Sequence, residues 1–272
     1  MFKIYLVVSA ALLLLLDVPF DIFTSSWGWW ATPLLLVGFC LGFVVLHVGL
    51  AALLIATTNL DKPSKDGDFF RRLINGFLQM ALPLLRVKVH TTGVEKIPAD
   101  EPFLLVSNHI HDLDPAIIYY AAPDSRLAFI GKKEVRELFP FVYKALHRLG
   151  GLPIDRENNR EAAKTIISAA RLIKEGKNSV AVFPEGYVSK SGELLPLRNG
   201  ALKIATKTGC KIVVCTLWGT KQIPKNLLRR KTDINFDVLD VIDTSNTTQT
   251  AELGERISEL MLASINNYKS QQ

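Results

Sequence analysis

The chain has 272 residues, of which 49% are hydrophobic and 21% are charged, with a formal net charge of +6. This hydrophobic fraction exceeds the needs of an ordinary soluble domain of this charge and indicates a membrane-bound protein with one main domain. Its three cysteines have no pairing or metal-ligand spacing, which argues against a disulfide scaffold and indicates a reducing compartment.

Two apolar segments occupy the N-terminal region. Ile4–Leu16 has 13 residues, which is short for a span, whereas Pro33–Ile55 has 23 residues without a formal charge. As a helix, the second segment can cross the roughly 30 Å of hydrocarbon in a bilayer. We therefore predict that residues 1–60 form a membrane-anchoring helical hairpin; whether the first segment spans or re-enters stays open.

The charges around these segments predict which side of the membrane the main domain faces. The loop over residues 17–32 contains no Lys or Arg, and the cations that follow the second segment are Lys62, Lys65, Arg71 and Arg72. By the positive-inside rule, the loop faces outward. The sequence thus predicts a cell-membrane protein whose main domain, residues 61–272, faces the cytoplasm.

An amphipathic helix is predicted over residues 69–82. Its polar arc carries Arg71, Arg72, Asn75 and Gln79, and apolar side chains fill the rest. A basic face beside an apolar one suits an anionic membrane surface, and a helix that covers a sheet has the same periodicity. Both interpretations remain open.

Strands and helices alternate through the rest of the chain. The predicted strands are 86–91, 103–106, 180–182, 211–217 and 234–241, and the predicted helices are 159–175 and 251–265. This alternation is typical of an α/β domain in which helices cover a mostly parallel sheet.

Two polar motifs follow predicted strands. Asn108–Pro115 comes after the apolar run 103–106, and Phe183–Gly186 comes after 180–182. The turn that follows a strand is the usual place for chemistry in an open α/β sheet, so both motifs are expected at one sheet edge. His109 and Asp114 fit an acid/base pair, because a carboxylate can fix the tautomer of a histidine that accepts a proton at neutral pH.

Two other interpretations of the first motif remain. Asp114 precedes Pro115, so it is predicted to cap a helix, and capping is a sufficient reason for its presence. His109, His111 and Asp112 resemble the start of a metal-ligand cluster. The remaining histidines provide no second ligand pair at metal spacing, and we predict no metal.

With these motifs in place, the chain resembles the glycerophospholipid acyltransferases, whose bacterial archetype is 1-acyl-sn-glycerol-3-phosphate acyltransferase. The blocks that carry the resemblance are Asn108–Asp114, Phe129–Glu134, Gly151–Arg156 and Phe183–Gly186. The resemblance implies His109 as base, Asp114 as its partner and an arginine, Arg156, that holds the phosphate; Lys132 is a second candidate for the phosphate. It also implies substrate contacts for Lys132, Phe183, Pro184, Glu185 and Gly186, with Glu185 accepting a glycerol hydroxyl.

The chain departs from the family pattern at one informative place. Tyr187 and Val188 stand where the family usually has Thr-Arg, so a hydroxyl becomes a ring and a cation is lost. Ser189, Lys190 and Arg198 are the candidates to compensate. The acceptor head group is therefore open.

The resemblance implies acyl transfer from acyl-CoA or acyl carrier protein to the sn-2 hydroxyl of 1-acyl-glycerol-3-phosphate, which forms phosphatidic acid. We expect no cofactor beyond the acyl-donor substrate and no nucleic-acid partner. The alternatives are an acyltransferase for another lysophospholipid, a non-catalytic lipid-binding protein with the same anchor, and a metal-dependent hydrolase.

Overall fold

The structure is a computed structural model that describes residues 2–20, 22–62, 67–227 and 229–270. Lys65, one of the predicted flanking cations, lies outside these residues. The described strands form one seven-stranded sheet in the order β1-β7-β6-β2-β5-β3-β4. They are β1 (Val87–Thr92), β2 (Leu104–Ser107), β3 (Leu127–Lys132), β4 (Leu152–Ile154), β5 (Ser179–Val182), β6 (Ile212–Trp218) and β7 (Thr232–Ile242).

The sheet is mostly parallel, as predicted. Among the pairings in the described residues, β6 with β7 is antiparallel, and β2, β3, β4, β5 and β6 run in one direction. The central strands have nearly continuous apolar sequences because helices cover both faces of the sheet. Leu104 and Val106 point into one core and Leu105 into the other, since side chains alternate along a strand.

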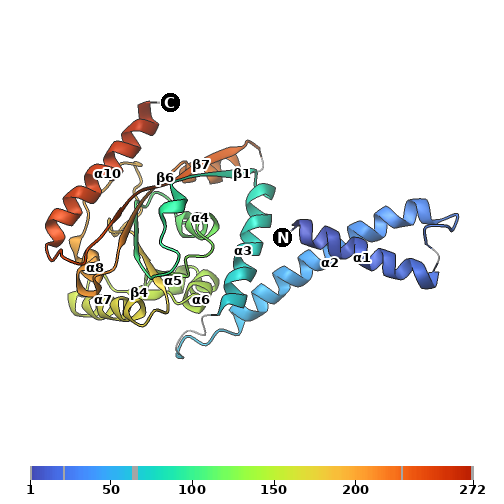
Figure 1. The fold of residues 1–272 in the computed structure, drawn as a ribbon, viewed down its shortest axis with the longest axis horizontal. Coiled ribbons are helices and arrows are strands. Elements are labelled where there is room, and N and C mark those ends of the chain that lie inside the picture. Colours follow the sequence, from blue (N-terminus) through green and yellow to red (C-terminus); the bar gives the residue numbers. More distant parts are fainter. Residues whose placement is uncertain (1, 21, 63–66, 228, 271–272) are drawn as a thin grey trace.

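Helices cover the two faces (Figure 1). One core contains side chains of α3 (Asp68–Leu84), α4 (Asp114–Ala121) and the end of α2 (Gly28–Ala56). The other contains side chains of α7 (Asn159–Lys174), α8 (Lys203–Thr208) and α10 (Thr250–Ser270). The remaining helices are α5 (Val135–Leu138), α6 (Pro140–Arg148), α9 (Ile223–Asn226) and the 3-10 turns Val94–Lys96, Asn199–Leu202 and Thr220–Gln222.

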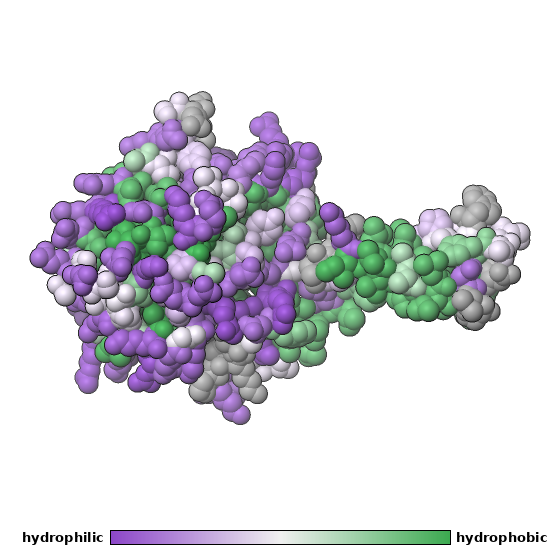
Figure 2. Space-filling view, viewed as in Figure 1, coloured by the Kyte–Doolittle hydropathy of each residue, from purple (hydrophilic) through white to green (hydrophobic). Residues whose placement is uncertain are grey.

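The N-terminal helices α1 (Phe2–Phe20) and α2 (Gly28–Ala56) project from this α/β body (Figure 1). They run antiparallel, because Ser9 lies by Cys40 while Tyr5 lies by Phe43 and His47. Figure 2 shows the projecting pair as a largely hydrophobic stalk beside a mostly hydrophilic body. In the described residues, one helical segment, Trp30–Ala56, is long and apolar enough to cross a membrane.

Two hydrogen bonds of His47 connect the stalk, which consists of α1 and α2, to the α/β body. His47 is buried within α2; its Nδ1 lies 2.5 Å from the Tyr5 hydroxyl, and its Nε2 lies 2.8 Å from the Leu73 carbonyl oxygen of α3. The carbonyl can only accept, so Nε2 carries the proton and Nδ1 accepts from Tyr5. Ala51 and Ile55, in the last turns of α2, also pack into the core beside α3.

Helix α3 covers the sheet, which was one of its two predicted roles. One residue of its polar arc, Arg71, is buried. Arg71 is 7% exposed and donates to the carbonyl oxygens of Leu127 (3.1 Å) and Leu149 (2.8 Å). Arg71 is therefore not part of an exposed basic face, which the membrane-surface interpretation of this helix required. The helix also continues through Pro83 to Leu84.

Candidate active site

The predicted site residues follow the ends of four adjacent parallel strands. In the order β2, β5, β3 and β4, these strands lead to His109, Phe183, Lys132 and Arg156. The carboxyl ends of parallel strands share one edge, so a single edge presents all four positions. The pairing of β2 with β5 brings together the two motifs that the sequence placed at one edge.

His109 and Asp114 form the centre of this edge. The His109 Nδ1 atom lies 2.8 Å from Asp114 Oδ2; the His109 side chain is 13% exposed and the Asp114 side chain is fully buried. A carboxylate accepts hydrogen bonds, so Nδ1 carries the proton and Nε2 has a free lone pair. Nε2 is thereby available to accept a proton from a bound molecule.

The Asp114 carboxylate is held by the turn that precedes it. Oδ2 also accepts the backbone N–H groups of Ile110 (2.7 Å) and His111 (2.8 Å), and Oδ1 accepts the Thr220 hydroxyl (2.7 Å). Asp114 is the first residue of α4, Leu113 occupies the N-cap position, and no side chain there caps the helix. The predicted capping role is therefore wrong; the carboxylate folds back over the His109 turn instead of onto its own helix.

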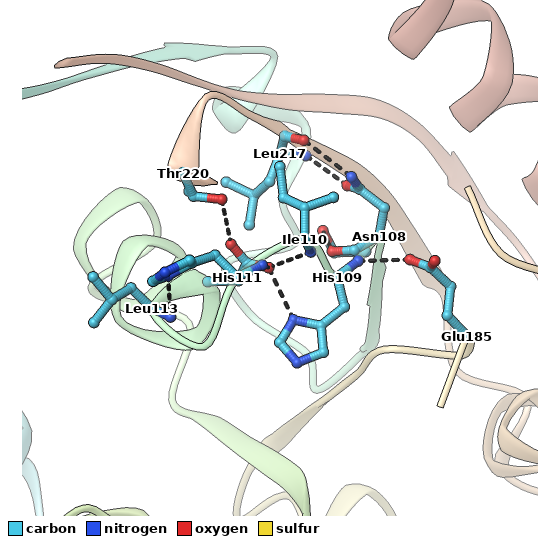
Figure 3. A network of polar contacts seen from close by, with 10 residues as sticks. Asn108, His109, Ile110, His111, Leu113, Glu185, Leu217 and Thr220 are labelled. Atoms are coloured by element: carbon cyan, nitrogen blue, oxygen red, sulfur yellow. Dashed lines mark hydrogen bonds and ion pairs between the residues drawn. The ribbon is translucent and has the colours of Figure 1, made fainter. Parts of the chain in front are cut away.

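Two more side chains fix the backbone around His109 (Figure 3). Asn108 exchanges two hydrogen bonds with the backbone of Leu217 in β6, at 2.7 and 3.0 Å. Glu185 Oε1 accepts the His109 N–H (2.6 Å) and Oε2 accepts the Leu195 N–H (2.8 Å). Both Glu185 oxygens are thus engaged by the protein, and burial raises the pKa of this carboxyl.

The second motif packs directly against the histidine. The Phe183 ring stacks on the His109 ring with centroids 4.1 Å apart and an interplanar angle of 13°. The Pro184 carbonyl accepts the N–H of Arg198 (2.8 Å). Gly186 has a φ of +80°, and a Cβ there would lie 3.1 Å from Arg198 Nε, so glycine leaves room for the arginine to cross the turn.

Arg156 and Arg198 converge at the neighbouring tyrosine. Their guanidinium carbons lie 5.7 and 5.0 Å from the centroid of the Tyr187 ring. Burial and the charge of Arg198 lower the pKa of the Arg156 guanidinium. The two like charges therefore lie near each other at the Tyr187 ring.

The other candidate phosphate-binding residues lie differently. Lys132 ends β3, and its Nζ is 4.0 Å from Glu134 Oε2. The Ser189 hydroxyl donates to the Glu193 carbonyl (2.6 Å) and accepts from the Gly192 N–H (3.1 Å), so it is used within its own loop. Of the three residues proposed to replace the missing family cation, Arg198 is the one that lies against Tyr187.

The metal alternative has little support in this geometry. His111 turns its Nδ1 toward its own loop, where it accepts the Leu113 N–H (3.1 Å). Among the described residues, no group of three or more His, Cys, Asp and Glu side chains is arranged to hold a metal ion. The direct substrate contacts predicted for Lys132, Phe183, Pro184, Glu185 and Gly186 stay predictions.

Sequence reasoning missed Thr220. It lies 106 residues from Asp114, in a 3-10 turn after β6, and the sequence contains no motif that links the two. The local signal is Gly219, whose φ of +94° turns the chain just before it. Such a turn predicts a bend at the end of a strand but not the partner of the hydroxyl.

The chain is similar to known acyltransferases in sequence and in fold. The family model described as Acyltransferase matches residues 88–218. A 1-acyl-sn-glycerol-3-phosphate acyltransferase from Haemophilus influenzae is 31% identical over 174 residues, which are 61% of this chain and 69% of that protein. The crystal structure of the 1-acyl-sn-glycerophosphate acyltransferase PlsC from Thermotoga maritima is similar with a TM-score of 0.64 and 25% identity, over 84% of this chain and 90% of that one.

Other relatives match over a shorter part of their length. The 1-acyl-sn-glycerol-3-phosphate acyltransferase of Borreliella burgdorferi is 31% identical over 54% of this chain and 58% of its own. The chloroplastic enzyme BAT2 of Brassica napus is 33% identical over 57% of this chain and 46% of its own. The chain thus spans about half the length of these two relatives. The match to the Haemophilus protein, the family model and the shared fold together show that the chain belongs to the acyltransferase family.

Proposed function

We propose that this protein transfers an acyl group from a thioester, acyl-CoA or acyl carrier protein, to the free sn-2 hydroxyl of 1-acyl-glycerol-3-phosphate, which forms phosphatidic acid. The observation that carries the proposal is the His109–Asp114 contact of 2.8 Å, which leaves Nε2 free to act as a base beside two arginines. The names of the relatives support the choice of acceptor.

In the proposed reaction, His109 Nε2 takes the proton of the acceptor hydroxyl as that oxygen attacks the thioester carbonyl carbon. Asp114 stabilises the imidazolium that forms. The C–S bond then breaks, the acyl group stays on the acceptor oxygen, and the thiol leaves with the proton from the imidazolium. The proton and the acyl group are both accounted for by the two substrates, so the mechanism requires no resident cofactor.

Arg156 and Arg198 are proposed to bind the acceptor phosphate. Guanidinium groups bind oxyanions through two parallel hydrogen bonds, and an anion between the two arginines relieves their mutual repulsion. Two cations beside Tyr187 repel choline and ethanolamine, the positively charged head groups of other lysophospholipids. This charge favours an acceptor whose phosphate is a monoester.

The stalk is proposed to hold the protein in the cell membrane with its α/β body in the cytoplasm. Along α2, several aliphatic side chains are more than half exposed: Leu34, Val37, Leu41, Val45, Leu46 and Leu53. Such a surface is stable in hydrocarbon and unfavourable in water. An acceptor with an acyl tail lies in the same bilayer, so its hydroxyl reaches the site without the tail entering water.

The proposed function is tested by transfer of labelled acyl groups from acyl-CoA and acyl carrier protein to a panel of lysophospholipids, with the purified full chain in detergent. We expect phosphatidic acid from lysophosphatidic acid and much slower transfer to lysophosphatidylcholine. Transfer to a different lysophospholipid alone contradicts the head-group assignment. No transfer from either donor contradicts the enzymatic function and favours the lipid-binding alternative.

Replacing Arg198 by alanine is expected to raise KM for lysophosphatidic acid about 10- to 100-fold, because a hydrogen bond to a charged group contributes about 1.5–3 kcal/mol. Steady-state kinetics in detergent measures the change, and kcat should change much less. Arg198→Lys keeps the positive charge but lacks the planar guanidinium group, so its KM should lie between those of the wild type and of Arg198→Ala.

The matched control is Arg171→Ala. Arg171 lies in the last turn of α7, which returns the chain to the amino end of β5 and hence to the opposite sheet edge. A KM that rises equally in both variants would show that net charge, and not the Arg198 position, governs acceptor binding.

A further inference from the structure

An exposed apolar patch lies where α5 meets α6. Leu138, Phe139, Phe141 and Val142 are 71%, 55%, 51% and 49% exposed. We call these four side chains the elbow patch. Large apolar side chains gathered on a surface mark an interaction site, because each is unfavourable in water.

The elbow patch is fixed beside the end of the proposed membrane span. From α6, Lys144 Nζ donates to the Ala56 carbonyl (2.9 Å) and Arg148 Nη1 donates to the Leu54 carbonyl (3.3 Å). Ala56 is the last residue of α2 and of the segment long enough to cross a membrane. The elbow patch therefore lies near the level at which α2 leaves the hydrocarbon.

The length of α2 supports this placement. The 27 residues of Trp30–Ala56 extend about 40 Å as a helix, which is more than the roughly 30 Å of hydrocarbon in a bilayer. The end of the helix thus reaches the head-group layer, where a neighbouring apolar surface can enter the boundary between head groups and acyl chains. Figure 1 shows α6 beside the end of α2 that adjoins the body.

The charge around the elbow patch suits an anionic lipid surface. Residues 132–148 contain five Lys and Arg against two Glu. Lys133 and Arg136 are exposed on the same segment, and Lys62 follows the end of α2. Basic residues beside exposed aromatic and aliphatic side chains are typical of surfaces that bind anionic bilayers.

We propose that the elbow patch is a second membrane-binding surface, which inserts into the head-group boundary of an anionic bilayer and turns the active-site edge toward the lipid. Lys132 ends β3 at that edge, and α5 follows it within three residues. The proposal rests on the proposed function in one respect, that α2 crosses the bilayer that holds the acceptor.

A fluorescence measurement tests the insertion without any activity. The full chain carrying Phe141→Trp is reconstituted in vesicles of phosphatidylglycerol and phosphatidylcholine with brominated acyl chains, and the wild-type signal from the four native tryptophans is subtracted. The matched control is Leu262→Trp, because Leu262 is 42% exposed on α10, which covers the sheet face opposite α3. We expect strong quenching at position 141 and little at 262. Equal quenching at the two positions overturns the proposal.

A kinetic measurement tests the consequence for the acceptor. Leu138→Ser combined with Phe141→Ser is expected to raise the apparent KM for lysophosphatidic acid in vesicles about tenfold, because the removed side chains no longer bury apolar surface in the lipid. Activity in detergent micelles should equal that of the wild type, and Leu262→Ser should change neither value. An unchanged KM in vesicles overturns the proposal, whereas absence of transfer by the wild type overturns the proposed function and leaves the quenching test valid.

Discussion

Replacing His109 by alanine is expected to lower kcat for acyl transfer about 10²- to 10⁴-fold, the usual contribution of a positioned general base. The loss follows from the geometry: Asp114 holds the proton on Nδ1, and Nε2 is the free base at the sheet edge. KM for lysophosphatidic acid should change little, because Arg156 and Arg198 remain. The measurement is steady-state transfer from acyl-CoA in detergent.

The fold of this variant is expected to survive. The His109 side chain makes one hydrogen bond, to Asp114, and stacks on Phe183. Its backbone bonds to Glu185 and Ser189 do not depend on the imidazole. Equal melting temperatures in detergent would confirm this, and a variant that melts normally and retains full kcat would exclude His109 as the base.

Replacing Asp114 by asparagine is expected to lower kcat about 10²- to 10⁴-fold with a small change in stability. An asparagine oxygen in place of Oδ2 still accepts the N–H groups of His109, Ile110 and His111, and the amide can donate to the Thr220 hydroxyl. The hydrogen bonds are kept and the negative charge is lost. The activity of this variant therefore measures the stabilisation of the imidazolium by that charge.

Asp114→Ala is the matched comparison. It leaves several buried donors without a partner, and each costs about 1–3 kcal/mol, so this variant should also melt at a lower temperature. Comparison of Asp114→Asn with Asp114→Ala separates the effect of the negative charge on kcat from the effect of the hydrogen bonds on stability. If Asp114→Asn keeps wild-type kcat, the carboxylate serves the turn alone, and the proposed role of its charge is wrong.

Local sequence pattern predicted several helices and strands closely, although β3 and β4 were not among the predicted strands. The helix predicted over 159–175 is observed as Asn159–Lys174, and the strand predicted over 211–217 is observed as Ile212–Trp218. These elements were predictable because hydrophobic periodicity and terminal residues act over a few neighbouring positions. The division at residue 60 between anchor and main domain stays a prediction.

The His109–Asp114 pair was visible in the sequence for the same reason. The two residues lie five positions apart across one turn, so a short motif holds both partners. The sequence could not assign Asp114 to the turn instead of the helix cap, because an aspartate at that position suits both uses. The backbone path from His109 to His111 decides between them, and it directs the carboxylate to the turn.

By itself, the sequence determined the apolar span, the alternation of strands and helices, and the two motifs at strand ends. Only the tertiary structure decided the contacts between distant residues: Thr220 on Asp114, Arg198 over Tyr187, and the burial of Arg71 under two carbonyl oxygens. Hydrophobic periodicity depends only on residues that are close in the sequence, so the sequence alone is enough to recognise it. The partner of a side chain across the sheet depends on strand order and register, which many weak interactions fix together.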